Sequence, residues 1–116
     1  MGEKTASCKK GVVANGEVAY DGFSDFYPFY LAQHANRTCR RLHFAGTTIG
    51  IAALLHSLST LDFRWLLAGI GAGYLLAWVG HFFFEKNRPA TFTHPLYSFM
   101  ADWVMWKDML LGRLRF

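Results

Sequence analysis

Charged side chains are scarce in this 116-residue chain, at 17% of its residues against about 25% in an average soluble domain. Hydrophobic residues make up 53%, including eleven Phe and four Trp. Such a surplus of apolar surface requires a non-aqueous solvent or a large oligomer. The length is that of a single domain, so the composition favours a small membrane protein over an ordinary soluble one.

Cysteine is nearly absent too. Cys8 and Cys39 form no CxxC pair, and two isolated cysteines do not make a disulfide framework, so we interpret them as free thiols in a reducing compartment. Residues 1–22 contain no apolar run of the kind that a signal peptide needs. Because this stretch is also polar and aperiodic, we predict a flexible tail over 1–22, followed by one helical membrane domain over 23–112.

The net charge of +4 is small, and no Lys/Arg stripe interleaves with polar helix positions. This pattern argues against nucleic acid as a partner and fits contact with anionic lipid headgroups.

Two apolar segments, residues 42–61 and 65–84, have the length of about 20 residues that a bilayer demands. The short turn between them makes the second segment return antiparallel to the first. Small residues in both segments favour close helix packing. We therefore predict an all-α integral membrane protein: an antiparallel two-span helical hairpin, an interfacial N-terminal helix beginning at Phe23, and a packed C-terminal helix from Pro95 to a stop at Gly112.

Basic residues mark one end of this hairpin: Arg37, Arg40 and Arg41 precede the first span, and Lys86 and Arg88 follow the second. The positive-inside rule then places both chain ends in the cytoplasm. The membrane would be the bacterial inner membrane, or that of the endoplasmic reticulum in a eukaryote. We expect Asp102 to pair with one of the arginines.

Four histidines fall at or beside the same end of the hairpin, namely His34, His43, His81 and His94. His56 lies thirteen residues past His43, roughly 20 Å away along a helix. Ionisable groups gathered at a membrane face indicate a functional site, and imidazole is the commonest metal ligand in proteins. Imidazole and carboxylate ligation with open positions is what non-haem Fe(II) chemistry requires.

Glu85 adds to this pattern. It lies four residues after His81 and would share its helix face, as a carboxylate co-ligand or an orienting group.

The blocks FYPFYLAQHANRTCRRLHFAGT (26–47) and AWVGHFFFEKNRPATFTHPLYSFMADW (77–103) resemble the membrane-protein family that includes the fungal endoplasmic-reticulum 2-hydroxy fatty acid dioxygenase. The resemblance covers residues from about 23 to 111. It implies Fe(II)-dependent α-oxidation, in which O2 is used to shorten a 2-hydroxy fatty acid by one carbon. The positions that match the family's motif histidines are His34, His43, His81 and His94.

On this basis we expect an iron-dependent 2-hydroxy fatty acid dioxygenase, with a lipid bilayer, the 2-hydroxy acid and O2 as partners. The expected catalytic residues are Glu85, Asn87 and Arg88. The substrate carboxylate would meet Arg37, Arg41 or Arg88, and the acyl tail would run along Trp78 and Phe82. Two alternatives remain open: a haem protein that uses His43 and His81 as ligands, and a non-catalytic lipid-binding or scaffold protein.

Overall fold

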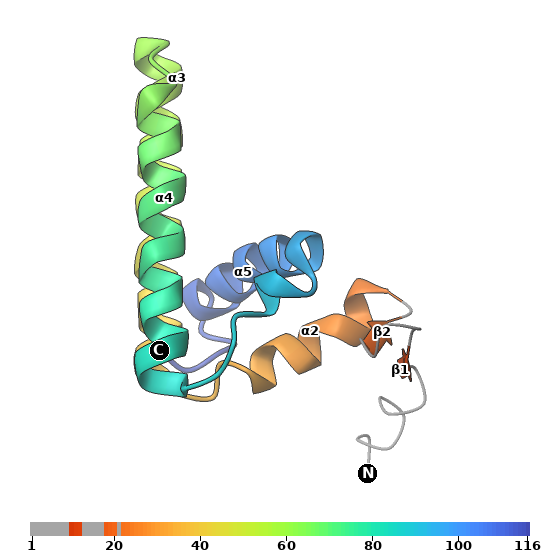
Figure 1. The fold of residues 1–116 in the computed structure, drawn as a ribbon. Helices are drawn as coiled ribbons and strands as arrows, with labels where there is room; N and C mark the ends of the chain where they lie inside the picture. The colour runs from red at the N-terminus through yellow and green to blue at the C-terminus, as the bar shows by residue number, and fades with distance from the viewer. Residues whose placement is uncertain (1–9, 13–17, 21) are drawn as a thin grey trace.

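The protein is helical, as a computed structural model shows for residues 10–12, 18–20 and 22–116 (Figure 1). The elements in chain order are β1 (Lys10–Val12), β2 (Val18–Tyr20), α2 (Phe23–Ala32), α3 (Arg37–Thr60), α4 (Arg64–Val79), the π-helix η1 (Gly80–Glu85), the 3-10 helix η2 (Ala90–Phe92) and α5 (Pro95–Leu110). The two strands pair antiparallel, with Gly11 opposite Ala19. They lie within the stretch predicted to be a flexible tail; residues 1–9, 13–17 and 21 of that stretch lie outside the described residues.

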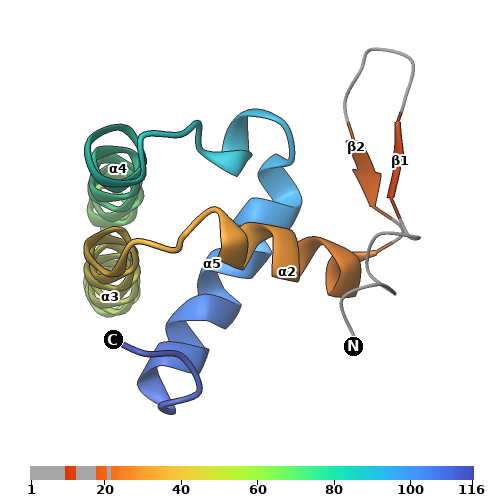
Figure 2. The same cartoon turned by 90° about the horizontal axis from the view of Figure 1, so that it is seen from below.

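Two long helical units dominate the shape. α3 packs along α4, and α4 continues without a break into η1 (Figure 1). Seen end-on, α3 and α4 lie side by side, while α2 and α5 extend away from one end of the pair (Figure 2). The molecule thus has a long helix pair and a crosswise layer, which meet at the end formed by the beginning of α3 and by η1.

Glycines set the distance between α3 and α4. A Cβ atom added at Gly46 would lie 3.0 Å from the carbonyl oxygen of Gly73, and one added at Gly69 would lie 2.4 Å from the Cβ atom of Ala53. These positions accept no side chain without moving the helices apart. By contrast, a Cβ atom at Gly50 or Gly71 would meet nothing within 4 Å. Only part of the glycine pattern therefore serves close packing.

Both long units have the length and composition to cross a membrane: Arg37–Thr60, and Arg64–Glu85, which joins α4 to η1. Only 22% and 17% of their most apolar windows are buried inside the protein. Large apolar side chains such as Leu55, Leu67 and Leu75 are more than 60% exposed. A core helix of a soluble protein would be mostly buried, so this pattern favours an apolar surrounding.

α3 begins five residues before the predicted span because Asn36 caps it. The Asn36 side chain accepts hydrogen bonds from the backbone nitrogens of Thr38 (2.8 Å) and Cys39 (3.2 Å). An asparagine that satisfies these unpaired amides stabilises a helix start by about 0.5–2 kcal/mol. The cap lengthens the helix into the arginine cluster and fixes the chain break after α2.

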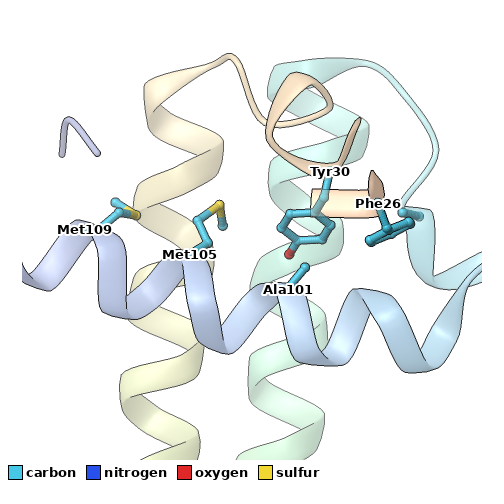
Figure 3. Packing of buried hydrophobic residues seen from close by; sticks show 6 residues of the cluster. Phe26, Tyr30, Ala101, Met105 and Met109 are labelled. Carbon is cyan, nitrogen blue, oxygen red and sulfur yellow. The ribbon is translucent and has the colours of Figure 1, made fainter. Parts of the chain in front are cut away.

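The crosswise layer has its own small core, between α2, η2 and α5 (Figure 3). Its buried residues are Phe26, Tyr30, Ala90, Ala101, Met105 and Met109. The Tyr27 hydroxyl donates to Asp108 across the same interface (2.7 Å). As predicted, α5 begins at Pro95, and Gly112 follows its end with a positive φ of 79°.

The glycine contacts predict opposite effects for one substitution at two positions of α4. Replacing an open helical glycine by alanine gains up to about 1 kcal/mol, so Gly71→Ala should stabilise the protein. Gly69→Ala should destabilise it by about 1–3 kcal/mol, because the new methyl group overpacks against Ala53. Chemical unfolding in detergent, followed by circular dichroism, measures both; equal effects would contradict this packing.

Candidate metal centre

Three imidazoles converge where the crosswise layer meets the helix pair. His34 follows α2, His43 lies in α3 and His81 lies in η1, and all three are buried. The Nε2 atoms of His34 and His43 are 3.1 Å apart. The ring centroid of His81 lies 4.4 Å from that of His34 and 5.0 Å from that of His43. The three side chains form one cluster, although they come from three separate elements.

His34 is held from the α2 side. Its Nδ1 atom donates to the backbone carbonyl of Tyr30 (2.6 Å), and the two rings stack with centroids 4.2 Å apart. The chain break after α2 lets this residue turn toward α3. The break is fixed by the Asn36 cap and by Glu85, whose carboxylate accepts a hydrogen bond from the backbone nitrogen of Asn36.

His43 is held from the α5 side. Its Nδ1 atom lies 2.8 Å from an Asp102 carboxylate oxygen, and the Thr47 hydroxyl donates to the other oxygen of the same carboxylate. Tyr30, which reaches from α2 toward α5 in Figure 3, adds a longer hydrogen bond to Asp102 (3.4 Å). The prediction that Asp102 pairs with an arginine is therefore wrong. α5 crosses α3 at this point, which brings Asp102 to the imidazole rather than to the exposed arginine side chains.

His81 is held by the loop that follows it. η1 is a π-helix, and Lys86 ends it in the left-handed conformation (φ 59°), so the chain folds back. The Asn87 side-chain oxygen then accepts from His81 Nδ1 (2.8 Å). Asn87 donates in turn to the backbone carbonyl of Gln33 (3.1 Å). The group that orients His81 is thus Asn87, while Glu85 bonds to the start of α3.

These contacts fix the tautomer of each ring. A carbonyl, a carboxylate and an amide oxygen can only accept, so the Nδ1 atom of each histidine carries the hydrogen. Where both rings are neutral, each has a bare lone pair on Nε2, and the Nε2 atoms of His34 and His43 face each other 3.1 Å apart. Such an arrangement is repulsive unless a cation lies between the rings. Nitrogens bound to one metal ion at about 2.0–2.1 Å are about 2.9–3.4 Å apart, a range that includes the observed separation.

Cys39 is the fourth member of the cluster. Its Sγ atom and one ring nitrogen from each of His34, His43 and His81 all lie within 4.8 Å of one another. The thiol is free and buried, one helical turn before His43. Its four-residue spacing from His43 was a signal in the sequence, but a cysteine without a CxxC partner was interpreted there only as a free thiol.

The other two histidines lie elsewhere. His94 lies between η2 and α5, with its ring centroid 5.3 Å from those of Tyr20 and Phe26, and it does not belong to the cluster found among the described residues. His56 is exposed near the far end of α3, against the ring of Trp65.

The residues expected to bind substrate are dispersed. Arg37 and Arg41 donate to the backbone carbonyl of Phe116 (3.3 and 3.2 Å) at the surface. Arg88 is exposed in the loop after η1, and Phe82 is exposed with its ring near Phe92.

Of the residues expected to bind substrate, Trp78 is the one that lines a cavity of about 240 Å³. His43 and His81 line the same cavity.

Comparison with known families agrees with these observations. The family model described as 2-hydroxy-palmitic acid dioxygenase Mpo1-like matches residues 20–114. The chain belongs to this family. The Mpo1-like match spans α2 to α5 and includes every member of the His and Cys cluster. Searches of curated proteins and of solved structures found no match.

Burial lowers the pKa of His34 well below its usual value, and the neighbouring His43 and His81 act in the same direction. In the metal-free protein the folded state therefore resists protonation at His34, whereas the unfolded chain takes up that proton below about pH 6.5. Stability should then fall as pH decreases from 7 to 5. Melting temperatures in a nonionic detergent should show this loss, and the loss should shrink in His34→Gln.

His56→Gln is the matched control, because His56 is exposed and should leave the pH dependence unchanged. An equal slope in all three proteins would contradict the assignment of His34.

Proposed function

We propose that this protein is a membrane-bound, iron-dependent dioxygenase of 2-hydroxy fatty acids. The observation that carries the proposal is the convergence of ring nitrogens from three buried histidines beside a mostly apolar cavity. The cluster fits a transition-metal ion, and the family description points to 2-hydroxypalmitic acid and oxygen as the reactants.

His34, His43 and His81 would hold the metal, with the Cys39 thiol beside them. When bound, Fe(II) would supply the redox chemistry of O2 and a Lewis-acid contact for an α-hydroxy acid. The chain's own groups orient the three rings through hydrogen bonds to Tyr30, Asp102 and Asn87. Losing such an orienting partner typically weakens metal binding 10–100-fold.

Glu85 and Asn87, expected as catalytic residues, would act here by positioning. Glu85 supports the start of α3, and Asn87 orients His81. Arg88 is exposed beside Asn87, where it could meet a carboxylate arriving at the charged face.

The overall reaction is balanced without an external reductant. One 2-hydroxy acid and one O2 give the fatty acid one carbon shorter, one CO2 and one water. The four electrons that reduce O2 come from C2 and from the carboxyl carbon, and the C1–C2 bond is the one that breaks.

The helix pair would cross the bilayer as a hairpin, with the crosswise layer at its surface. Arg37, Arg41 and Lys86 lie at the metal-centre end, whereas Arg64, at the other end, is paired with Asp62 (2.8 Å). This asymmetry supports a cytoplasmic location for the metal centre. In a bacterium the membrane would be the inner membrane; in a eukaryote it would be that of the endoplasmic reticulum. A substrate that dissolves in lipid would then reach the centre from within the bilayer.

The metal ligands can be tested by iron content. Purified His34→Ala, His43→Ala and His81→Ala should each lose bound iron while the protein still inserts, because insertion depends on the apolar spans. His94→Ala and His56→Ala should keep the wild-type content. Elemental analysis measures the metal, and a visible absorption spectrum detects any haem. A Soret band would favour the haem protein, and a metal-free wild type would favour the non-catalytic lipid-binding protein.

The reaction is tested with 2-hydroxypalmitate and palmitate in detergent. Only the 2-hydroxy acid offers a hydroxyl and a carboxylate that form a five-membered chelate, so it alone should be converted, to a 15-carbon acid detected by mass spectrometry. Chelation should abolish turnover and Fe(II) should restore it, whereas Zn(II), which has no redox chemistry, should not. Iron-loaded, folded protein that consumes no O2 with any 2-hydroxy acid would remove the dioxygenase proposal.

A further inference from the structure

The cavity beside the metal centre is polar at one end only. Its polar end includes His43, His81 and Asp102. From there it follows the α3–α4 interface past Gly46 and Gly73 and ends at Leu54 and Leu66. The remainder of its lining is mostly apolar or glycine. The shape therefore suits a molecule with a polar head and one long apolar tail.

The length of the cavity can be compared with an alkyl chain. Leu54 lies eleven residues after His43, and Leu66 lies fifteen residues before His81, so the apolar end is about 17–22 Å from the histidines at 1.5 Å per helical residue. Carbon–carbon bonds of about 1.5 Å at angles near 111° advance about 1.25 Å per carbon in an extended chain. The cavity then matches an acyl chain of about 13–18 carbons.

Ser98 gives a separate indication of a ligand. Ser98 is among the residues that line the cavity, and it is 96% buried. Its hydroxyl is the one buried side-chain oxygen or nitrogen without a hydrogen-bond partner among the described residues. A buried hydroxyl left unpaired costs about 1–3 kcal/mol. It lies one helical turn before Asp102, on the same helix and beside the same cavity. A polar head bound near His43 and His81 would supply the missing partner.

Gly50 keeps the apolar part of the cavity open. A Cβ atom added there would meet nothing within 4 Å, although Gly50 faces the α3–α4 interface and lines the cavity. Gly46 and Gly69, in contrast, are glycines because the helices touch there. Packing between the helices does not explain the absence of a side chain at Gly50, whereas space for a tail does.

We propose that this cavity is the acyl-binding site, in which Ser98 holds the polar head of a long-chain 2-hydroxy acid and Gly50 leaves room for its tail. The proposal rests on the proposed function for the identity of the head group. It assigns the tail to the groove between α3 and α4. Phe82, expected from the sequence to guide the tail, is exposed and does not line the cavity, whereas Trp78 does.

Binding without turnover tests this site. Iron-loaded protein in detergent is kept free of O2, and dissociation constants are measured for 2-hydroxy acids of 8, 12 and 16 carbons by competition with tritiated 2-hydroxypalmitate. Gly50→Leu should weaken the 16-carbon acid at least tenfold and the 8-carbon acid less than about twofold. Gly71→Leu is the matched control, because that position is open but lies outside the cavity, and it should change neither.

Ser98→Ala tests the polar end. It should weaken acids of every length by a similar factor of about 2–10, the value of one hydrogen bond, while leaving the melting temperature of the ligand-free protein unchanged or raised. A merely structural serine would lower that melting temperature and leave binding unchanged. Leu66→Trp, at the apolar end of the cavity, should weaken the binding of the 16-carbon acid but not that of the 12-carbon acid. This variant replaces Gly50→Leu as the test if Gly50→Leu does not fold.

Two outcomes would overturn the site. In the first, Gly50→Leu and Leu66→Trp leave the dissociation constants for all chain lengths as they are in Gly71→Leu. In the second, they weaken the binding of every chain length equally. Failure of the dioxygenase is distinguishable from failure of the site. If the variants change binding selectively by chain length but no O2 is consumed, the dioxygenase proposal is rejected and the acyl-binding site is retained. If the substrate is turned over but the variants do not change the dependence on chain length, the acyl-binding site is rejected and the dioxygenase proposal is retained.

Discussion

The hydrogen bond on the outer nitrogen of each clustered imidazole is the interaction on which the rest of the structure depends. Three oxygens make it: the Tyr30 carbonyl, the Asp102 carboxylate and the Asn87 amide. They come from α2, from α5 and from the loop after η1. None belongs to the two long helical units, so α3 packed on the continuous α4 and η1 could hold His43 and His81 near each other but could not fix either ring. The crosswise layer supplies what the helix pair lacks.

Depth along the two apolar segments was enough to predict at which end of the helix pair His43 and His81 meet. His43 near the start of one segment and His81 near the end of the other must meet if the helices are antiparallel, and the structure brings them together. The helical class and the start of α5 at Pro95 also followed from apolar periodicity and from a proline that can only begin a helix. Each of these inferences used one-dimensional spacing alone.

Side-chain direction could not be predicted in the same way. His94 lies at the expected end, but its ring packs on Phe26 beside the small core, and Cys39 occupies the cluster. The partner of Asp102 depends on how α5 crosses α3, which no local pattern encodes. Glu85 illustrates a third limit: a shared helix face does not determine the bonding partner, and the Glu85 carboxylate accepts from the backbone nitrogen of Asn36 rather than from His81.

That π-helix makes the chain unusually sensitive to its own length at one place. A π-turn accommodates one more residue than an α-turn, and one residue corresponds to about 100° of rotation in a regular helix. Deleting a single residue between Gly80 and Glu85 would let the segment relax to an α-helix and turn the imidazole of His81 away from its partners. Relatives should therefore carry no insertion or deletion within the six positions of η1, even though exposed side chains there, such as Phe83, are free to vary.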